Sequence, residues 1–97
     1  MNYYTAYAAH MIRTYFTIPN PGKGVDGINW EAVKNVMETI RPKEQTLLKG
    51  IYLSEDAKNG NFREAVRKMS GAKGYNQTWN FVKKIEKAVA RERMLIE

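Results

Sequence analysis

Apolar side chains recur at three- and four-residue intervals through most of the chain, which is the period of helices that pack on a core. The first run predicts an aromatic helix from Tyr3 to Phe16. The second, with Asn29 as its N-cap, predicts a helix that ends at Arg41, and Pro42 suits the first turn of a third helix. The apolar positions of these three runs are Tyr4, Tyr7, Ala8, Met11 and Tyr15, then Trp30, Val33, Met37 and Ile40, and then Leu47, Leu48, Ile51 and Tyr52.

Three stretches interrupt the helical pattern. Residues 18–24 hold two prolines and two glycines, which stop a helix. Residues 54–61 are polar and end in an Asn-Gly-Asn sequence, which predicts a loop. Residues 70–74 contain two glycines and predict a break between a fourth helix over 62–70 and a fifth helix over about 76–95.

No segment shows the alternating pattern of a strand, so the predicted fold class is all-α with about five helices. A chain of 97 residues is long enough to bury one core and suits one compact domain. Within it we expect an aromatic N-terminal helix in residues 1–17, central helices in residues 29–53 and a C-terminal helix-turn-helix in residues 62–95.

Positive charge is concentrated in the last third of the chain. The net charge is +6, and residues 1–61 carry seven cations against six anions, whereas residues 62–97 carry nine against four. This asymmetry indicates a polyanionic partner, although many small domains are basic without binding nucleic acid.

The fifth predicted helix has one apolar and one cationic face. At about 100° per residue, Asn80, Lys83, Lys84, Lys87 and Arg91 lie within about 60° of Asn80. The two glutamates of this helix fall outside the cationic face, whereas an ordinary solvated face would mix the two signs at i,i+4 spacing. The arrangement favours a helix that packs on a core and meets an anion.

The last two predicted helices follow the order of a helix-turn-helix, in which a scaffold helix precedes one that enters the major groove. Amide, hydroxyl and lysine side chains read base edges there. The predicted base-contacting residues are Gln77, Thr78, Asn80, Lys83 and Lys84. The predicted phosphate-contacting residues are Arg63, Arg67, Lys68, Lys73, Lys87 and Arg91. Gln77 and Asn80 would equally suit ordinary polar surface.

Residues 44–53 (EQTLLKGIYL), 65–69 (AVRKM) and 84–91 (KIEKAVAR) resemble the region-4 helix-turn-helix of bacterial sigma factors. They are also similar to the sigma-like transcription regulators of phages and prophages in Gram-positive bacteria, the ArpU and RinA type. The resemblance implies a DNA-binding transcription regulator in the cytoplasm of a bacterial host cell, with base contacts at the start of the last helix. The segment 70–75 is longer than the tight turn usual in that family.

The N-terminal tyrosines allow two interpretations. Tyr3, Tyr4, Tyr7 and Tyr15 either pack on the central helices or form a partner interface, because aromatic residues are enriched among interface anchors. The second interpretation leads to an alternative function, a small helical adaptor or inhibitor that binds a protein such as an RNA polymerase or a nuclease. A homodimer would suit a DNA reader, since two-fold symmetry matches paired half-sites. A third interpretation is an RNA binder that uses the same cationic helix without base readout, although the chain shows none of the familiar RNA-recognition signatures.

Several function classes lack sequence support. With no cysteine and one histidine, His10, the chain predicts no disulfide, no tetrahedral metal site and no cofactor. It contains neither a nucleophile elbow nor a Walker-type phosphate loop, so we expect no enzyme and no small-molecule substrate. Short apolar runs and a start that lacks basic residues predict neither a membrane span nor a signal peptide, and we expect a soluble cytoplasmic protein.

Overall fold

The computed structural model describes residues 3–19 and 22–96, and the side chains of Tyr3 and Lys73 lie outside that description. The described residues form helices and no strand, which confirms the all-α class. The helices are α1 (Tyr3–Thr17), α2 (Gly24–Met37), α3 (Pro42–Tyr52), α4 (Glu55–Lys58), α5 (Phe62–Ser70) and α6 (Tyr75–Glu92), with a 3-10 turn (Gly71–Lys73) before α6.

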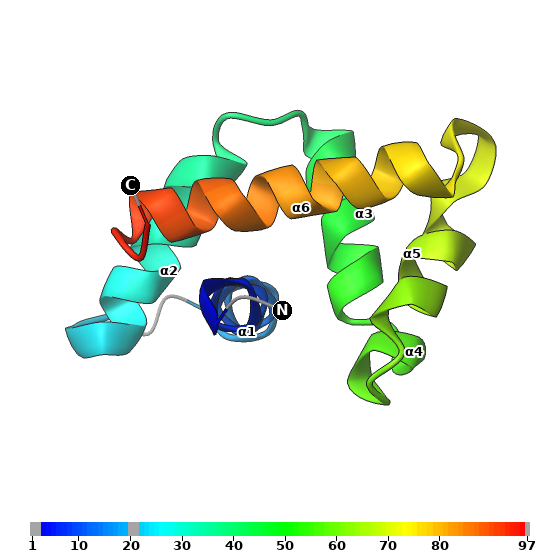
Figure 1. Cartoon of the computed structure of the whole chain (residues 1–97). Coiled ribbons are helices and arrows are strands. Elements are labelled where there is room, and N and C mark those ends of the chain that lie inside the picture. Colours follow the sequence, from blue (N-terminus) through cyan, green and yellow to red (C-terminus); the bar gives the residue numbers. More distant parts are fainter. Residues whose placement is uncertain (1–2, 20–21, 97) are drawn as a thin grey trace.

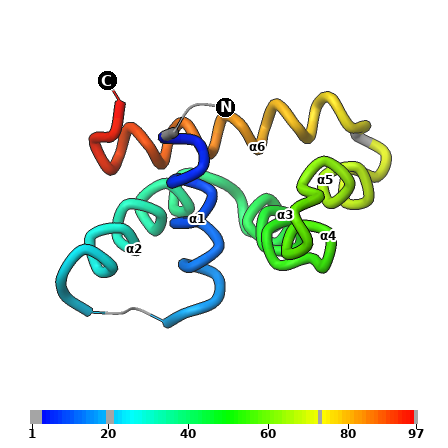
Figure 2. Tube along the Cα trace, turned by 60° about the horizontal axis from the view of Figure 1, so that its bottom comes forward, coloured from blue at the N-terminus to red at the C-terminus, as the bar shows by residue number. Residues whose placement is uncertain are grey.

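The helices form two groups that α6 bridges. Figure 1 shows α1 and α2 beneath the C-terminal half of α6, and α3, α4 and α5 at its N-terminal end. The turned view in Figure 2 shows the same division, with α6 running across both groups. Contacts of α6 with α1, α2 and α5 agree with this arrangement. The last helix therefore has one side on the body of the protein and the other on its surface.

The core lies along the inner side of α6. Val82, Ile85 and Val89 are almost fully buried, together with residues of the other helices. Burying each such side chain contributes about 1.5–3 kcal/mol relative to exposure. The buried apolar residues from the remaining helices include Ala8, Met11, Ile12, Ala32, Val33, Val36, Met37, Leu48, Ile51, Tyr52, Ala57, Ala65 and Val66. Most of these buried positions belong to the apolar stripes that the sequence shows at three- and four-residue intervals.

Two helix starts differ from the expected ones. The stretch 54–61 was expected to be a loop, but it contains α4, because Ser54 Oγ accepts a hydrogen bond from the Ala57 amide at 3.2 Å and Ala57 is buried. Helix α2 begins at Gly24, five residues before its expected N-cap. The Asn29 side chain does not cap a helix, because it donates to Tyr7 Oη at 3.0 Å and accepts from Arg93 Nε at 2.7 Å.

The two ends of α6 also differ from those predicted for the last helix. The helix starts at Tyr75 and ends at Glu92, three residues before the expected Leu95. Met94 has a φ of 65°, and the Leu95 amide donates to the Ala90 carbonyl at 2.8 Å. This pattern, with a left-handed residue after the helix, is the Schellman motif that satisfies terminal carbonyl groups. In the described part of the chain, no helix is both long enough and apolar enough to cross a membrane.

Candidate nucleic-acid interface

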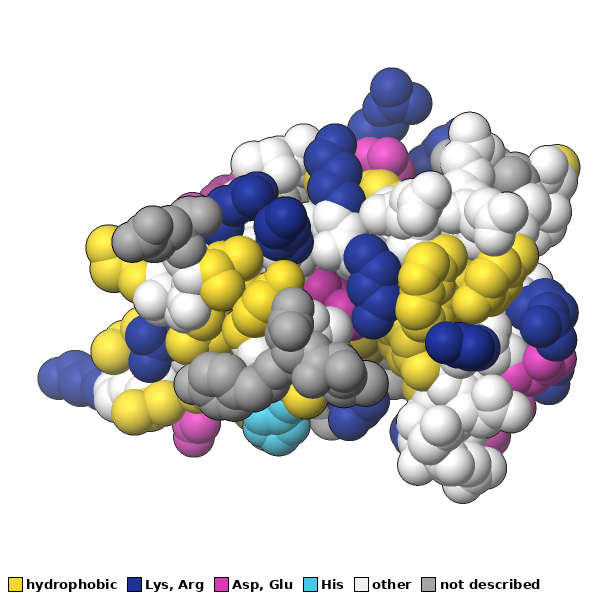
Figure 3. All heavy atoms as spheres, viewed as in Figure 1, with side chains coloured by type: hydrophobic (Ala, Val, Ile, Leu, Met, Phe, Trp, Pro, Cys, Tyr) yellow, Lys and Arg dark blue, Asp and Glu magenta, His cyan; other side chains and the backbone are white. Residues whose placement is uncertain are grey.

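Five polar side chains form a continuous exposed line along α6, which we call the α6 stripe. Its members are Gln77, Asn80, Lys84, Lys87 and Arg91, spaced alternately by three and four residues and all exposed. Across residues 3–19 and 22–96, no side-chain hydrogen bond or ion pair involves any of the five. Lys and Arg side chains stand along the upper edge of the molecule in Figure 3, over α6. The stripe thus begins with two amide side chains and continues with three cations that form no ion pair with the described residues.

Lys83, which the sequence predicts as a base contact, does not belong to the stripe. Its ammonium lies 3.1 Å from Glu86 Oε1, 4.6 Å from the centroid of the Trp79 ring and 5.8 Å from that of Phe62. The ion pair and the two cation–π contacts hold the charge against the body of the protein. At 60° from Asn80, Lys83 sits at the edge of the predicted cationic face, which is where packing decides its direction.

Thr78 is also a predicted base contact, but the structure buries its side chain. It is 2% exposed, and its Oγ1 donates to the Gly74 carbonyl at 3.1 Å. Thr78 stands four residues before the buried Val82, so it shares the apolar side of α6. The same helical spacing that identified the cationic face would have placed this residue inside.

The α5 cations predicted to contact phosphate are exposed but already have partners. Arg67 Nη1 lies 2.8 Å from Glu64 Oε2, and Lys68 Nζ lies 2.9 Å from Asp56 Oδ2. The hydrogen bond to Asp56, together with its charge, raises the pKa of Lys68. The Arg63 guanidinium lies over the Trp79 ring, 5.9 Å from its centroid. These charges are therefore weaker candidates for phosphate contact than those of the stripe, and Lys73 lies outside the described side chains.

A buried polar link joins α6 to α3 beneath Lys83. Glu86 is 2% exposed and accepts hydrogen bonds from Tyr52 Oη and Lys83 Nζ. Burial and the neighbouring carboxylate raise the pKa of Tyr52 well above its ordinary value of 10.0. Because a buried carboxylate needs such partners, this link sets the rotation of α6 and directs the stripe outward. Tyr52 and Glu86 are 34 residues apart, and no local pattern predicts their pairing.

Two of the N-terminal tyrosines, Tyr7 and Tyr15, are partly buried and contact α2, and the predicted partner interface stays a prediction. Tyr7 Oη accepts a hydrogen bond from Asn29, and the Tyr15 ring lies 5.3 Å from both Phe16 and Trp30. Tyr7 and Tyr15 both pack against the core, as the first interpretation of the tyrosines expected. Tyr4 is half-buried, and the side chain of Tyr3 lies outside the described residues.

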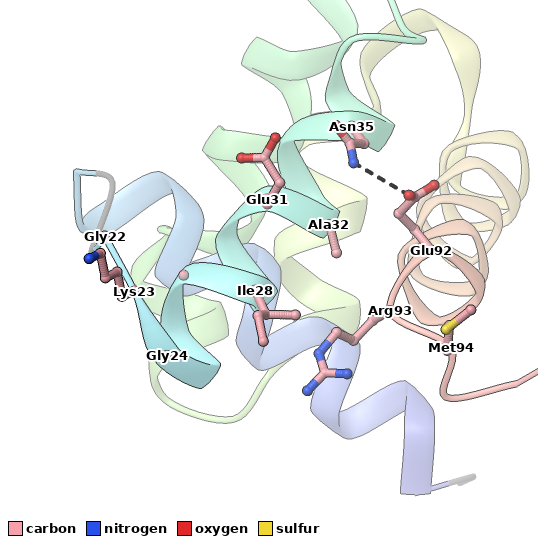
Figure 4. A pocket seen from close by; sticks show the side chains of 11 residues that line it. Gly22, Lys23, Gly24, Ile28, Glu31, Ala32, Asn35, Glu92, Arg93 and Met94 are labelled. Atoms are coloured by element: carbon pink, nitrogen blue, oxygen red, sulfur yellow. Dashed lines mark hydrogen bonds between the residues drawn. The ribbon is translucent and has the colours of Figure 1, made fainter.

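A pocket of about 600 Å³ lies between the start of α2 and the end of α6, and Figure 4 shows the side chains that line it. Lys23 and Arg93 line it together with Glu31 and Glu92, and Asn35 Nδ2 donates to Glu92 Oε2 at 3.3 Å. With both signs of charge in its lining, this cavity does not extend the cationic surface. No cluster of three or more metal-ligating side chains occurs in the part of the chain that the structure describes.

No family model, curated protein or solved structure matches the chain. The resemblance to sigma-factor region 4 therefore stays a prediction, and the function is inferred from the exposed side chains of α6.

Proposed function

We propose that the protein binds duplex DNA through the α6 stripe, as a transcription regulator with α5, the 3-10 turn and α6 acting as a helix-turn-helix. The observation that carries this proposal is the line of free cations, Lys84, Lys87 and Arg91, on the exposed side of a helix whose other side is buried. A solvated helix face without a partner usually balances such charges within one turn.

The dimensions of the stripe suit a major groove. From Gln77 to Arg91 it spans about 21 Å at 1.5 Å per residue, and one α-helix fits the groove width of about 12 Å. Gln77 and Asn80, near the N-terminal end, are the remaining candidates for bidentate contact with adenine, and Lys84 is the candidate for guanine. Lys87 and Arg91 would then contact phosphates, with Arg63 and Arg67 available if they leave their present partners.

Salt-dependent binding to a duplex tests the proposal. Lys84→Glu combined with Lys87→Glu should weaken binding about a hundredfold at low salt and reduce the slope of log K against log salt by about two. The matched control is Lys23→Glu at the start of α2 with Lys58→Glu on α4, which changes the net charge equally at two exposed positions that do not belong to the stripe. This control should weaken binding less than about fivefold.

Equal losses in the two double variants would contradict the proposal, because they would show a response to net charge alone. Duplex RNA of the same sequence provides the second comparison. Its deep, narrow major groove does not admit a helix, so tighter binding to RNA than to DNA would also contradict a major-groove interface.

A further inference from the structure

A groove separate from the α6 stripe runs between α1, the start of α5 and α6. It has a volume of about 730 Å³, within the range of ligand-binding pockets. Figure 3 shows hydrophobic side chains gathered below the N-terminal half of α6, with dark blue cationic side chains beside them. The apolar lining comes from Ala6, Ala9, Ala57, Phe62 and Trp79.

Three cations border this apolar groove. Arg13 reaches it from α1, Arg63 from α5 and Lys83 from α6. Among the described residues of the lining, Glu86 is the only acidic one, and Tyr52 and Lys83 already satisfy it. The Arg13 Nε is buried and has no hydrogen-bond partner within the described chain. A buried donor without an acceptor costs about 1–3 kcal/mol, and this cost is relieved if the Arg13 side chain turns toward a carboxylate in the groove.

We propose that this groove binds an acidic peptide segment of a partner protein, with a bulky apolar side chain on the alanine, Phe62 and Trp79 surface and carboxylates at Arg13 and Arg63. Charge complementarity selects an anion, and the apolar lining selects a side chain rather than a hydrated ion. A nucleobase fits less well, because the Trp79 ring is stacked on Tyr75 at 5.7 Å and already faces Lys83 and Arg63. The partner surface of α1 is then the side bearing Ala6, Ala9 and Arg13.

A matched pair of variants at Ala6 tests the groove. Ala6 is exposed and lines the groove, and glutamate and lysine fit a helix almost as well as alanine, so both variants should fold. Random peptides of about twelve residues would be displayed and selected on the whole chain. Synthetic copies of the enriched peptides would be titrated while the indole N–H signals of Trp79 and Trp30 are followed by NMR, with Trp30 as an internal reference on α2.

The expected result is enrichment of Asp and Glu around an aromatic or aliphatic residue, with a shift of the Trp79 signal and none of Trp30. Ala6→Glu should weaken binding at least about tenfold relative to Ala6→Lys, because like charges across an interface repel. Enriched peptides without an acidic bias would overturn the proposal, as would equal affinities of the two variants. Displacement of the peptide by single-stranded oligodeoxythymidine, with the same Trp79 shift, would also overturn it in favour of nucleic acid.

The groove shares no residue with the α6 stripe, and Arg63 is the one residue named both for the groove and for phosphate contact. Lys84→Glu with Lys87→Glu should leave peptide affinity within about threefold, and Ala6→Glu should leave duplex affinity within the same range. Loss of peptide binding in the stripe variant would contradict a peptide site separate from the stripe. Failure of DNA binding alone would not affect the proposed peptide site.

Discussion

Two neighbouring lysines of α6, Lys83 and Lys84, carry the same charge and differ in what surrounds them. Lys83 is held by Glu86 and by the Trp79 and Phe62 rings, while Lys84, the next residue, has no such partner among the described residues. A rotation of about 100° between neighbours places one ammonium against a buried carboxylate and the other in solvent. A count of basic residues treats them alike, yet one stabilises the fold and the other is free to meet an anion.

Removing the carboxylate beneath Lys83 should have the largest effect on stability. Glu86→Ala leaves Lys83 and the buried Tyr52 hydroxyl without their acceptor, and we expect a loss of about 3 kcal/mol in the free energy of unfolding. Urea denaturation measures it. Glu92→Ala, at an exposed carboxylate of the same helix, should cost less than about 0.5 kcal/mol. Similar losses of unfolding free energy in the two variants would show that the buried Glu86 stabilises the fold no more than an exposed glutamate.

Replacing each of the two adjacent lysines by methionine separates folding from binding. Lys83→Met leaves Glu86 buried with only Tyr52 as a partner and should cost about 2 kcal/mol of stability. Lys84→Met should change stability by less than about 0.5 kcal/mol and weaken duplex binding about tenfold. Paired urea titrations and duplex-binding curves provide the check. A larger loss of duplex affinity in Lys83→Met than in Lys84→Met would contradict the roles given to the two lysines, Lys83 in stability and Lys84 in DNA contact.

Alkaline unfolding probes the buried side through Tyr52. Its pKa in the folded protein is raised above 10.0 by burial and by Glu86, so the unfolded chain loses this proton first as pH rises. The Tyr52 contribution is therefore complete below pH 10.0 and is lost above it, by up to about 1.4 kcal/mol per pH unit. Tyr52→Phe should be less stable at neutral pH and show a shallower decline above pH 10. Parallel slopes for the two proteins would show that Tyr52 does not carry this dependence.

The helices were predictable because an apolar stripe with a helical period needs no knowledge of its partner. The same angular reasoning identified the stripe residues Asn80, Lys84 and Lys87, all of which are exposed. The contacts of Lys83 were not predictable, because its direction depends on Glu86 and Trp79, and the carboxylate in turn depends on Tyr52 from a different helix.

Long-range contacts likewise explain the remaining differences. The local sequence around Asn29 suits an N-cap, but Tyr7 and Arg93, distant in sequence, take up its side chain. The groove is lined from α1, α4, α5 and α6, and no single segment of the sequence contains it.

The most direct test of the DNA interface is an amide chemical-shift map of the isotopically labelled whole chain, titrated with duplex DNA at low and moderate salt. A DNA interface on the α6 stripe predicts the largest shifts at Gln77, Asn80, Lys84, Lys87 and Arg91, with smaller shifts on α5 and little change in α2 and α4. Shifts centred on α2 or α4, or no saturable shifts on α6, would contradict it.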